Sequence, residues 1–282
     1  MTVAVVSDSA CDLPAELAEG LGVKVVPLHI RFGDEELVDG RDLTTKEFWA
    51  RCRASRELPQ TAAPAPGAFR ELFVSLAEQG AAGIVCVTIS SKLSATNQAA
   101  TQAAGSLGGR PRVEVVDSLS VTLGQGLVVL AAAEAAAEGA SVEGVVAAAE
   151  SARSRLRVMG AIATLDNLRR GGRIGGAAAA LGGLLSIKPV IEVRGGVVEQ
   201  ESRQRTRAKS LRYLADKVRS AGPLERLAAM SADAADFEGF VDMLAGARPH
   251  RPLIVGDIGP VVGTHTGPGT IGVAWVRSAH SS

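Results

Sequence analysis

Short apolar runs alternate with amphipathic segments along the first half of the chain. The apolar runs have the length of buried strands and lie at residues 3–6, 23–30, 84–89 and 113–116. The segments between them repeat their apolar residues at helical spacing and predict helices at residues 14–19, 67–79, 94–104 and 126–138. Strands separated by helices imply right-handed crossovers and a mostly parallel sheet. The sequence therefore predicts an N-terminal α/β domain, residues 1–157, with helices flanking the sheet.

Local signals add detail to this first domain. Gly33-Asp34 lies between two apolar segments and predicts a hairpin over residues 31–38. Thr44, followed three positions later by Glu47, fits a capping box that opens a helix carrying Phe48 and Trp49. Residues 58–66 contain three prolines and predict a rigid loop.

The pattern changes after about residue 157. Gly195-Gly196 lies between two β-branched runs, which is typical of a hairpin. Other strands are predicted at 158–164, 227–230, 253–255 and 270–276, and helices at 205–218 and 236–244. Residues 165–183 are rich in glycine and alanine and predict helix or loop. Hairpin-paired strands with separate helices indicate a C-terminal α+β domain, residues 158–282, with a mixed or antiparallel sheet.

Composition limits the function classes. The 282 residues allow two domains, and 30 acidic residues balance 30 basic ones, which argues against binding to nucleic acid or an anionic membrane. Hydrophobic residues make up 46% and aromatic ones only 3%, so the core is aliphatic. Cys11, Cys52 and Cys86 form no CxxC pair, so we expect neither zinc nor disulfides. The N-terminus lacks a signal peptide and no stretch predicts a membrane span, so we expect a cytoplasmic protein.

Candidate chemistry starts at the ends of the predicted parallel strands, where open α/β sheets bind ligands. Ser7-Asp8-Ser9, Ser90-Ser91 and Asp117-Ser118 follow three of these strands. Ser7-Asp8-Ser9 could hold a nucleophile, but such a trio more often caps the next helix. Ser91 or Ser94 would be an ordinary N-cap, and Asp12 before Leu13-Pro14 is another N-cap candidate.

Phosphate-binding and hydrolase signatures are missing. The chain has no GxGxxG after a strand, no GxxxxGK[ST], no HExxH and no GxSxG. The glycine cluster at residues 171–176 lies among Arg169, Arg170 and Arg173, and is either a phosphate-binding turn or a structural turn with exposed arginines. His265 lies in a predicted polar loop, GTHTGPG at residues 263–269; taken alone, such a histidine is more often structural than functional.

The order of these motifs is more informative than any one of them. SDS, a T-x-x-P loop at Thr61, SSKLSAT around Ser94, VDSLSV, LDNLRRGGRIGG, LLSIKPVIE and GTHTGPG follow one another along the chain. This series resembles the DegV family of fatty-acid-binding proteins, which includes the FakB-type subunits of bacterial fatty acid kinase. The resemblance covers nearly the whole chain, with a DegV domain at about residues 3–279.

The resemblance implies a function and a site. Members of this family have two α/β domains that hold a long-chain fatty acid such as palmitate in a tunnel between them. The matching positions imply that Thr61 and Ser94 bind the carboxylate and that His265 lies close to it. Arg170, with Arg169 as its competitor, is implied in exchange of the acyl phosphate. A separate ATP-dependent kinase subunit would supply catalysis, feeding phospholipid synthesis, and the chain itself would need no metal or cofactor.

Two other functions stay open at this stage. A hydrolase or phosphotransferase would use His265 with Ser94 or Ser9, although no nucleophile–base–orienter spacing is visible. A lipid-responsive regulatory protein has the same sequence features as a carrier. The residues after Thr61 and Ser94 also depart from the family pattern: Ala62-Ala63 and Ala95 supply fewer polar neighbours for a head group.

Overall fold

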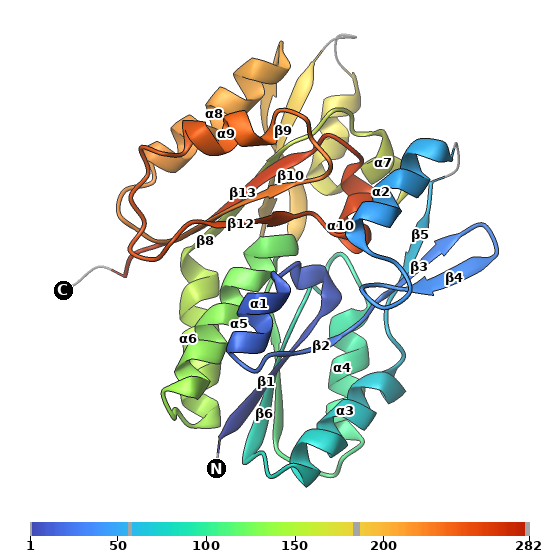
Figure 1. Cartoon of the computed structure of the whole chain (residues 1–282), viewed down its shortest axis with the longest axis vertical. Helices are drawn as coiled ribbons and strands as arrows, with labels where there is room; N and C mark the ends of the chain where they lie inside the picture. Colours follow the sequence, from blue (N-terminus) through green and yellow to red (C-terminus); the bar gives the residue numbers. More distant parts are fainter. Residues whose placement is uncertain (1, 56–57, 183–186, 280–282) are drawn as a thin grey trace.

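The computed structural model describes residues 2–55, 58–182 and 187–279, which form two lobes. The lower lobe in Figure 1 is built on a parallel sheet in the order β2-β1-β6-β7. Its strands are β1 (Val3–Asp8), β2 (Lys24–Val26), β6 (Gly83–Thr88) and β7 (Val113–Asp117). This confirms the predicted parallel sheet of the N-terminal domain.

Helices cover both faces of this sheet, which explains why every residue of β6 is buried. On one face lie α5 (Thr122–Ala137) and α6 (Val142–Arg155), and on the other lie α3 (Pro66–Glu78) and α4 (Thr96–Gly105). The sequence analysis did not predict α6. Its buried face is formed by two valines and two alanines, so its helical pattern of strongly apolar residues is weak.

A small antiparallel sheet, in the order β4-β3-β5, projects beside the junction of the lobes (Figure 1). It comprises β3 (His29–Phe32), β4 (Glu35–Val38) and β5 (Gln60–Ala62). The single strand predicted over residues 23–30 is wrong, because the chain divides at Pro27 into β2 and β3. The predicted loop at residues 58–66 contains β5, in which Thr61 pairs with Ile30 of β3.

The helix after this sheet's hairpin, α2 (Thr45–Ala54), begins as predicted. Thr44 and Glu47 form both hydrogen bonds of a capping box. Phe48 and Trp49 are buried, and they pack against the junction of the lobes. The capping prediction for Asp12 is wrong: Asp12 ends the 3-10 turn η1 (Ser9–Cys11) with φ of 51°, and α1 (Ala15–Gly20) follows Pro14.

The second lobe is a six-stranded mixed sheet, in the order β10-β9-β8-β13-β11-β12. Its strands are β8 (Leu156–Ala161), β9 (Lys188–Arg194), β10 (Val197–Gln204), β11 (Leu224–Ser231), β12 (Ile254–Asp257) and β13 (Ile271–Arg277). β9 and β10 form the predicted Gly195-Gly196 hairpin. Two helices, α8 (Arg207–Arg219) and α9 (Phe237–Met243), pack on one face and bury an aliphatic core there. The predicted α+β class is confirmed, while the division at residue 157 stays a prediction.

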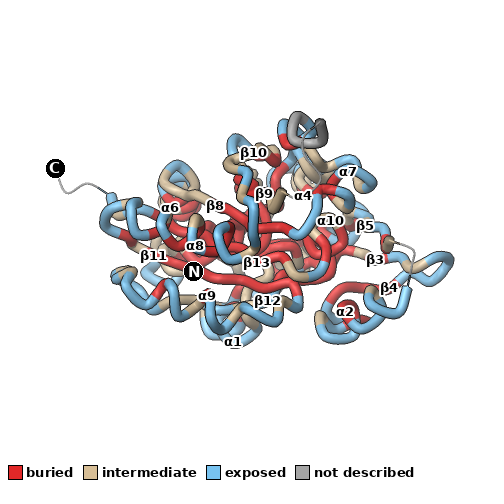
Figure 2. The backbone as a smooth tube through the Cα atoms, turned by 90° about the horizontal axis from the view of Figure 1, so that it is seen from above, coloured by how far each residue is buried: buried red, intermediate tan, exposed pale blue. Residues whose placement is uncertain are grey.

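The two lobes share a core. Helix α5 contacts β1 and β6 of the first lobe as well as β11 and β13 of the second. One cluster of buried side chains spans both, and the buried stretches of the tube in Figure 2 run through the middle of the molecule. This continuous packing places the loops and short helices at the junction in defined positions.

Two short helices at the junction carry part of the site, α7 (Asp166–Arg170) and α10 (Pro260–Thr266). The 3-10 segment η2 (Gly175–Gly182) lies against β10. The prediction of a loop around His265 is wrong, because His265 lies in the last turn of α10. Pro260 is favourable at the start of that helix, and Gly267, with φ of 78°, ends it. Leu184–Ser186 of the LLSIKPVIE motif lie outside the described residues.

One close approach anchors α10 to the first lobe. A Cβ on Gly263 would lie 2.7 Å from the Trp49 ring, so only glycine fits between the helix and this side chain. Within the described ranges, no helix is long and apolar enough to cross a membrane.

Candidate functional site

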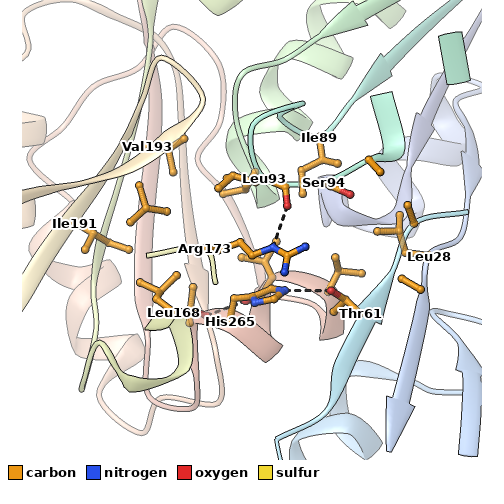
Figure 3. A pocket seen from close by; sticks show the side chains of 18 residues that line it. Leu28, Thr61, Ile89, Leu93, Ser94, Leu168, Arg173, Ile191, Val193 and His265 are labelled. Atoms are coloured by element: carbon orange, nitrogen blue, oxygen red, sulfur yellow. Dashed lines mark hydrogen bonds between the residues drawn. The ribbon is translucent and has the colours of Figure 1, made fainter. Parts of the chain in front are cut away.

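A pocket with aliphatic walls lies between the two lobes (Figure 3). Its volume is about 150 Å³, room for about ten water-sized groups on the scale where one water needs about 10–15 Å³. The first lobe contributes Leu28, Ile89, Leu93 and Val121; the second contributes Leu168, Ile191, Val193, Val198, Val261 and Val262. Such walls suit an unbranched apolar chain rather than a polar metabolite.

Polar side chains gather at one end of this pocket. Thr61 comes from β5, Ser94 from the turn before α4, and His265 from α10, and all three line the pocket. Thr61 Oγ1 lies 3.1 Å from His265 Nε2, although the two residues are 204 positions apart. The structure therefore brings together the three residues selected from the sequence; their role as carboxylate ligands stays a prediction.

Ser94 is held by the first turn of α4. Its Oγ accepts a 3.3 Å hydrogen bond from the Thr96 N–H and lies 2.9 Å from Thr96 Oγ1. The N-cap of α4 is Ala95, so neither Ser91 nor Ser94 has the N-cap position that the sequence suggested. If Thr96 Oγ1 donates in the 2.9 Å contact, the Ser94 hydroxyl hydrogen is left to donate into the pocket.

Arg173 also lies at this site, although the sequence analysis named it only as one of three arginines around the glycine cluster. Its guanidinium lies between Ser94 on one side and Thr61 and His265 on the other (Figure 3). Nε donates to the Leu93 carbonyl at 3.1 Å and Nη1 donates to the Gly171 carbonyl at 2.6 Å. Arg173 is the only lysine or arginine among the described residues that line the pocket.

The other two arginines of the motif point elsewhere. Arg169 and Arg170 are both exposed in the last turn of α7, and Arg169 pairs with Asp166 at 3.4 Å. Arg170 lines a second, more polar pocket of about 350 Å³, together with Gln60 and Asn167. This outer pocket shares Thr61, Arg173 and His265 with the apolar one. The role of Arg170 in acyl-phosphate exchange stays a prediction.

His265 is neutral at physiological pH. Burial and, to a smaller extent, the nearby Arg173 charge lower the pKa of its imidazole to about 4. The full positive charge at the polar end therefore belongs to Arg173. His265 Nδ1 has no hydrogen-bond partner among the described residues, so no carboxylate orients the ring as in a hydrolase triad.

This shift predicts a pH dependence of stability. Because the folded pKa is about 4 and the ordinary value is 6.5, the unfolded chain takes up a proton at His265 before the folded one. The contribution of His265 should therefore fall by up to about 3 kcal/mol as the pH drops from 6.5 to 4. The measurement is the difference in unfolding free energy between the natural protein and His265→Gln. The pH-dependent contributions of the buried carboxyl groups are the same in both proteins and cancel in this difference. A difference that does not change with pH would contradict it.

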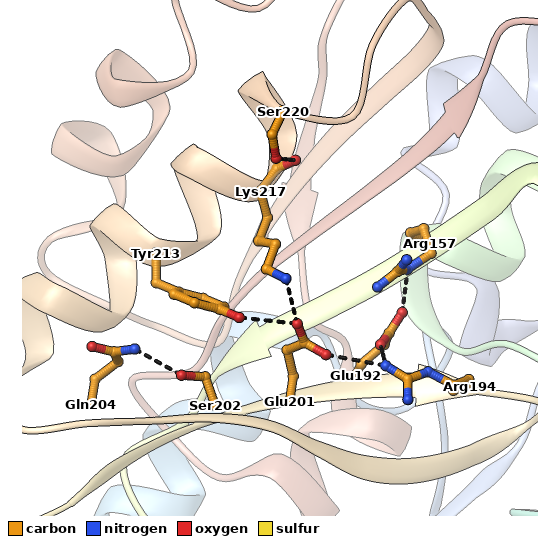
Figure 4. Close-up of polar contacts among 9 residues, drawn as sticks. All are labelled: Arg157, Glu192, Arg194, Glu201, Ser202, Gln204, Tyr213, Lys217 and Ser220. Atoms are coloured by element: carbon orange, nitrogen blue, oxygen red, sulfur yellow. Dashed lines mark hydrogen bonds and ion pairs between the residues drawn. The ribbon is translucent and has the colours of Figure 1, made fainter.

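The two faces of β9, which forms one wall of the pocket, carry different side chains. Ile191 and Val193 point into the pocket, whereas Glu192 between them points to the α8 face and is 1% exposed. Figure 4 shows Glu192 paired with Arg157 and Arg194. Glu201 on β10 accepts from Tyr213 Oη at 3.0 Å and pairs with Lys217 Nζ at 2.7 Å. These ionic contacts tie β8, β9, β10 and α8 together behind the pocket.

Comparison with known proteins assigns the chain to a family. The family model described as an uncharacterised protein of the DegV family matches residues 2–278. A DegV domain-containing protein of Deinococcus radiodurans is 39% identical, over 97% of this chain and 98% of that protein. The chain belongs to the DegV family. A DegV domain-containing protein of Streptomyces coelicolor is 37% identical, over 96% of this chain and 97% of its own length.

Solved structures of other proteins share the whole architecture of this chain. A Thermus thermophilus DegV protein, described as fatty acid binding, has 36% identity and a TM-score of 0.90 over 99% of this chain and 100% of its own. DegV of Bacillus subtilis, described as a fatty acid binding protein, has 28% identity and a TM-score of 0.87 over 99% and 100%. A stearic acid-binding protein of Eubacterium ventriosum has 27% identity and a TM-score of 0.84 over 97% of each chain.

Proposed function

We propose that this DegV protein binds a long-chain fatty acid such as palmitate and presents its carboxylate to a separate ATP-dependent kinase subunit. The resulting acyl phosphate would feed phospholipid synthesis in the cytoplasm. One observation carries the proposal: an aliphatic pocket between the lobes ends at Thr61, Ser94, His265 and Arg173. The fatty acids bound by the related DegV proteins support it.

The energetics favour such a ligand. Each buried methylene contributes about 0.8 kcal/mol, so a sixteen-carbon chain gives on the order of 10 kcal/mol before the costs of ordering. A buried carboxylate is costly unless hydrogen bonds and charge compensate it. Hydroxyl donors from Thr61 and Ser94, together with the Arg173 guanidinium, supply both in one place.

The two pockets suggest how the head group is handed over. The carboxylate lies where the pockets meet, beside Thr61, Arg173 and His265. A phosphoryl group added to it would extend into the outer pocket, toward Arg170 and Asn167. In this scheme Arg173 holds the head group and the exposed Arg170 contacts the acyl phosphate or the kinase, while the chain itself catalyses no step.

Mass spectrometry of organic extracts from the purified protein tests the proposal, followed by titration of the delipidated protein with palmitate. We expect a long-chain fatty acid in the extract and saturable binding with one site per chain. Addition of the kinase subunit and ATP should then yield acyl phosphate. Absence of both extracted and exchangeable fatty acid would overturn the proposal, and turnover of a small ester by the isolated chain would favour the hydrolase instead.

A further inference from the structure

Gly171 and Gly172 are adjacent, but glycine is required at the two positions for different physical reasons. Gly171 has φ of −78° and ψ of −6°, a conformation that any residue adopts. A Cβ there would nevertheless lie 2.3 Å from His265 Nδ1 and 3.0 Å from Cε1. Gly172 has φ of 70°, which favours glycine, but a Cβ on it would meet nothing within 4 Å. Space, rather than backbone conformation, requires glycine at position 171.

The Gly171 backbone is fixed on both sides. Its N–H donates to the Asn167 carbonyl at 2.8 Å, in the last turn of α7. Its own carbonyl accepts from Arg173 Nη1 at 2.6 Å. Gly171 therefore touches the imidazole through its Cα and the guanidinium through its carbonyl, and so links two side chains of the polar end.

The position of Gly171 decides which nitrogen of His265 carries the proton. The ring is neutral at physiological pH and has a single N–H. A proton on Nδ1 would point at Gly171 and find no acceptor, because Nδ1 is buried without a hydrogen-bond partner among the described residues. A proton on Nε2 is directed at Thr61 Oγ1, 3.1 Å away. The geometry therefore favours the Nε2–H tautomer.

This tautomer sets the direction of the next hydrogen bond. If Nε2–H donates to Thr61 Oγ1, the Thr61 hydroxyl hydrogen is left to point into the pocket. Thr61 then acts as a donor, and its best partner is a ligand oxygen that only accepts, such as an ionised carboxylate.

We propose that Gly171 is a positioning residue: its bare Cα holds His265 as the Nε2–H tautomer, which makes Thr61 a hydrogen-bond donor selective for carboxylates. This inference rests on the proposed function and adds the direction of the head-group hydrogen bonds to it. It predicts that palmitate binds more tightly than the fatty alcohol of the same length, whose hydroxyl hydrogen finds no acceptor on Thr61 and which carries no charge to complement Arg173.

The first test is independent of any ligand. Nitrogen-15 NMR of the ligand-free protein at neutral pH, with the His265 signals assigned by their loss in His265→Gln, reports which ring nitrogen is protonated. We expect a protonated Nε2 and an unprotonated Nδ1. A protonated Nδ1 would overturn the proposal, whether or not the protein binds fatty acid.

The second test uses paired variants in palmitate titrations. Gly171→Ala should displace the His265 ring and shift its nitrogen signals. Binding should weaken about tenfold or more, because the hydrogen bond between His265 and Thr61 is lost and a buried polar group is left without a partner. The control Gly172→Ala strains the backbone without touching the site, so it should lower the melting temperature and leave affinity within about twofold. His265→Gln, whose amide reaches the Nε2 position, should retain more affinity than His265→Asn, whose shorter amide does not.

Gly171→Ala with natural affinity and unchanged nitrogen signals would overturn the role of Gly171. If the natural protein binds no palmitate, the proposed function fails, and the tautomer measurement alone decides the geometric part of the inference.

Discussion

Replacing Arg173 with methionine is expected to weaken palmitate binding by about 2–3 kcal/mol, a loss of about 30- to 150-fold. Arg173 is the only full positive charge among the described residues that line the apolar pocket, and a hydrogen bond to a charged group is worth more than a neutral one. Methionine keeps much of the length and removes the charge. Calorimetric titration of the delipidated protein measures the effect.

Arg170→Met is the matched control for this substitution. Arg170 is exposed at the end of α7 and lines only the outer of the two pockets that we describe. We expect its loss to change palmitate affinity less than about threefold, while slowing acyl-phosphate formation with the kinase subunit. If Arg170→Met abolished binding and Arg173→Met did not, our placement of the carboxylate would be wrong.

Val193→Phe should close the apolar part of the pocket. Val193 lies on β9 with its side chain directed inward (Figure 3), and the larger ring would occupy the space of about four methylenes. At about 0.8 kcal/mol for each methylene, palmitate affinity should fall by about 3 kcal/mol, more than 100-fold. A shorter fatty acid should lose less, so titrations with two chain lengths separate a blocked channel from a damaged head-group site.

Val255→Phe controls for the substitution itself. Val255 is on the edge strand β12 and 47% exposed, outside the lining of the apolar pocket. Both variants should fold, since overpacking costs about 1–3 kcal/mol and an exposed position less. Equal palmitate affinity in the Val193 variant and the natural protein would mean that the chain runs elsewhere.

The lobes were predictable from sequence because their signals are local. Strand β6 contains an almost continuous apolar run, as expected of a strand buried on both faces, and the Gly195-Gly196 turn residues predict the hairpin. Helix α10 was not predictable in this way, since its seven residues include a glycine and four β-branched positions. It is stable because Trp49 packs against Gly263 and Thr61 bonds to His265, contacts that only the tertiary structure supplies.

The site, like helix α10, could not be predicted from local sequence signals alone. Thr61, Ser94 and His265 were selected through resemblance to a family, and no spacing in the chain shows that they share one pocket. Three arginines stand within five positions of one another, and nothing in the sequence separates them. What separates them is the tertiary structure: Arg173 donates to the Leu93 carbonyl beside the pocket, while Arg169 and Arg170 remain on the exposed end of α7.

A crystal structure of the delipidated protein soaked with palmitate tests the central claim most directly. We predict one extended acyl chain between the lobes, along Ile191 and Val193, with its carboxylate oxygens in hydrogen-bond distance of Thr61 Oγ1, Ser94 Oγ and the Arg173 guanidinium. A fatty acid bound on the outer surface, or one whose carboxylate lies at the far end of the pocket from these three groups, would contradict it.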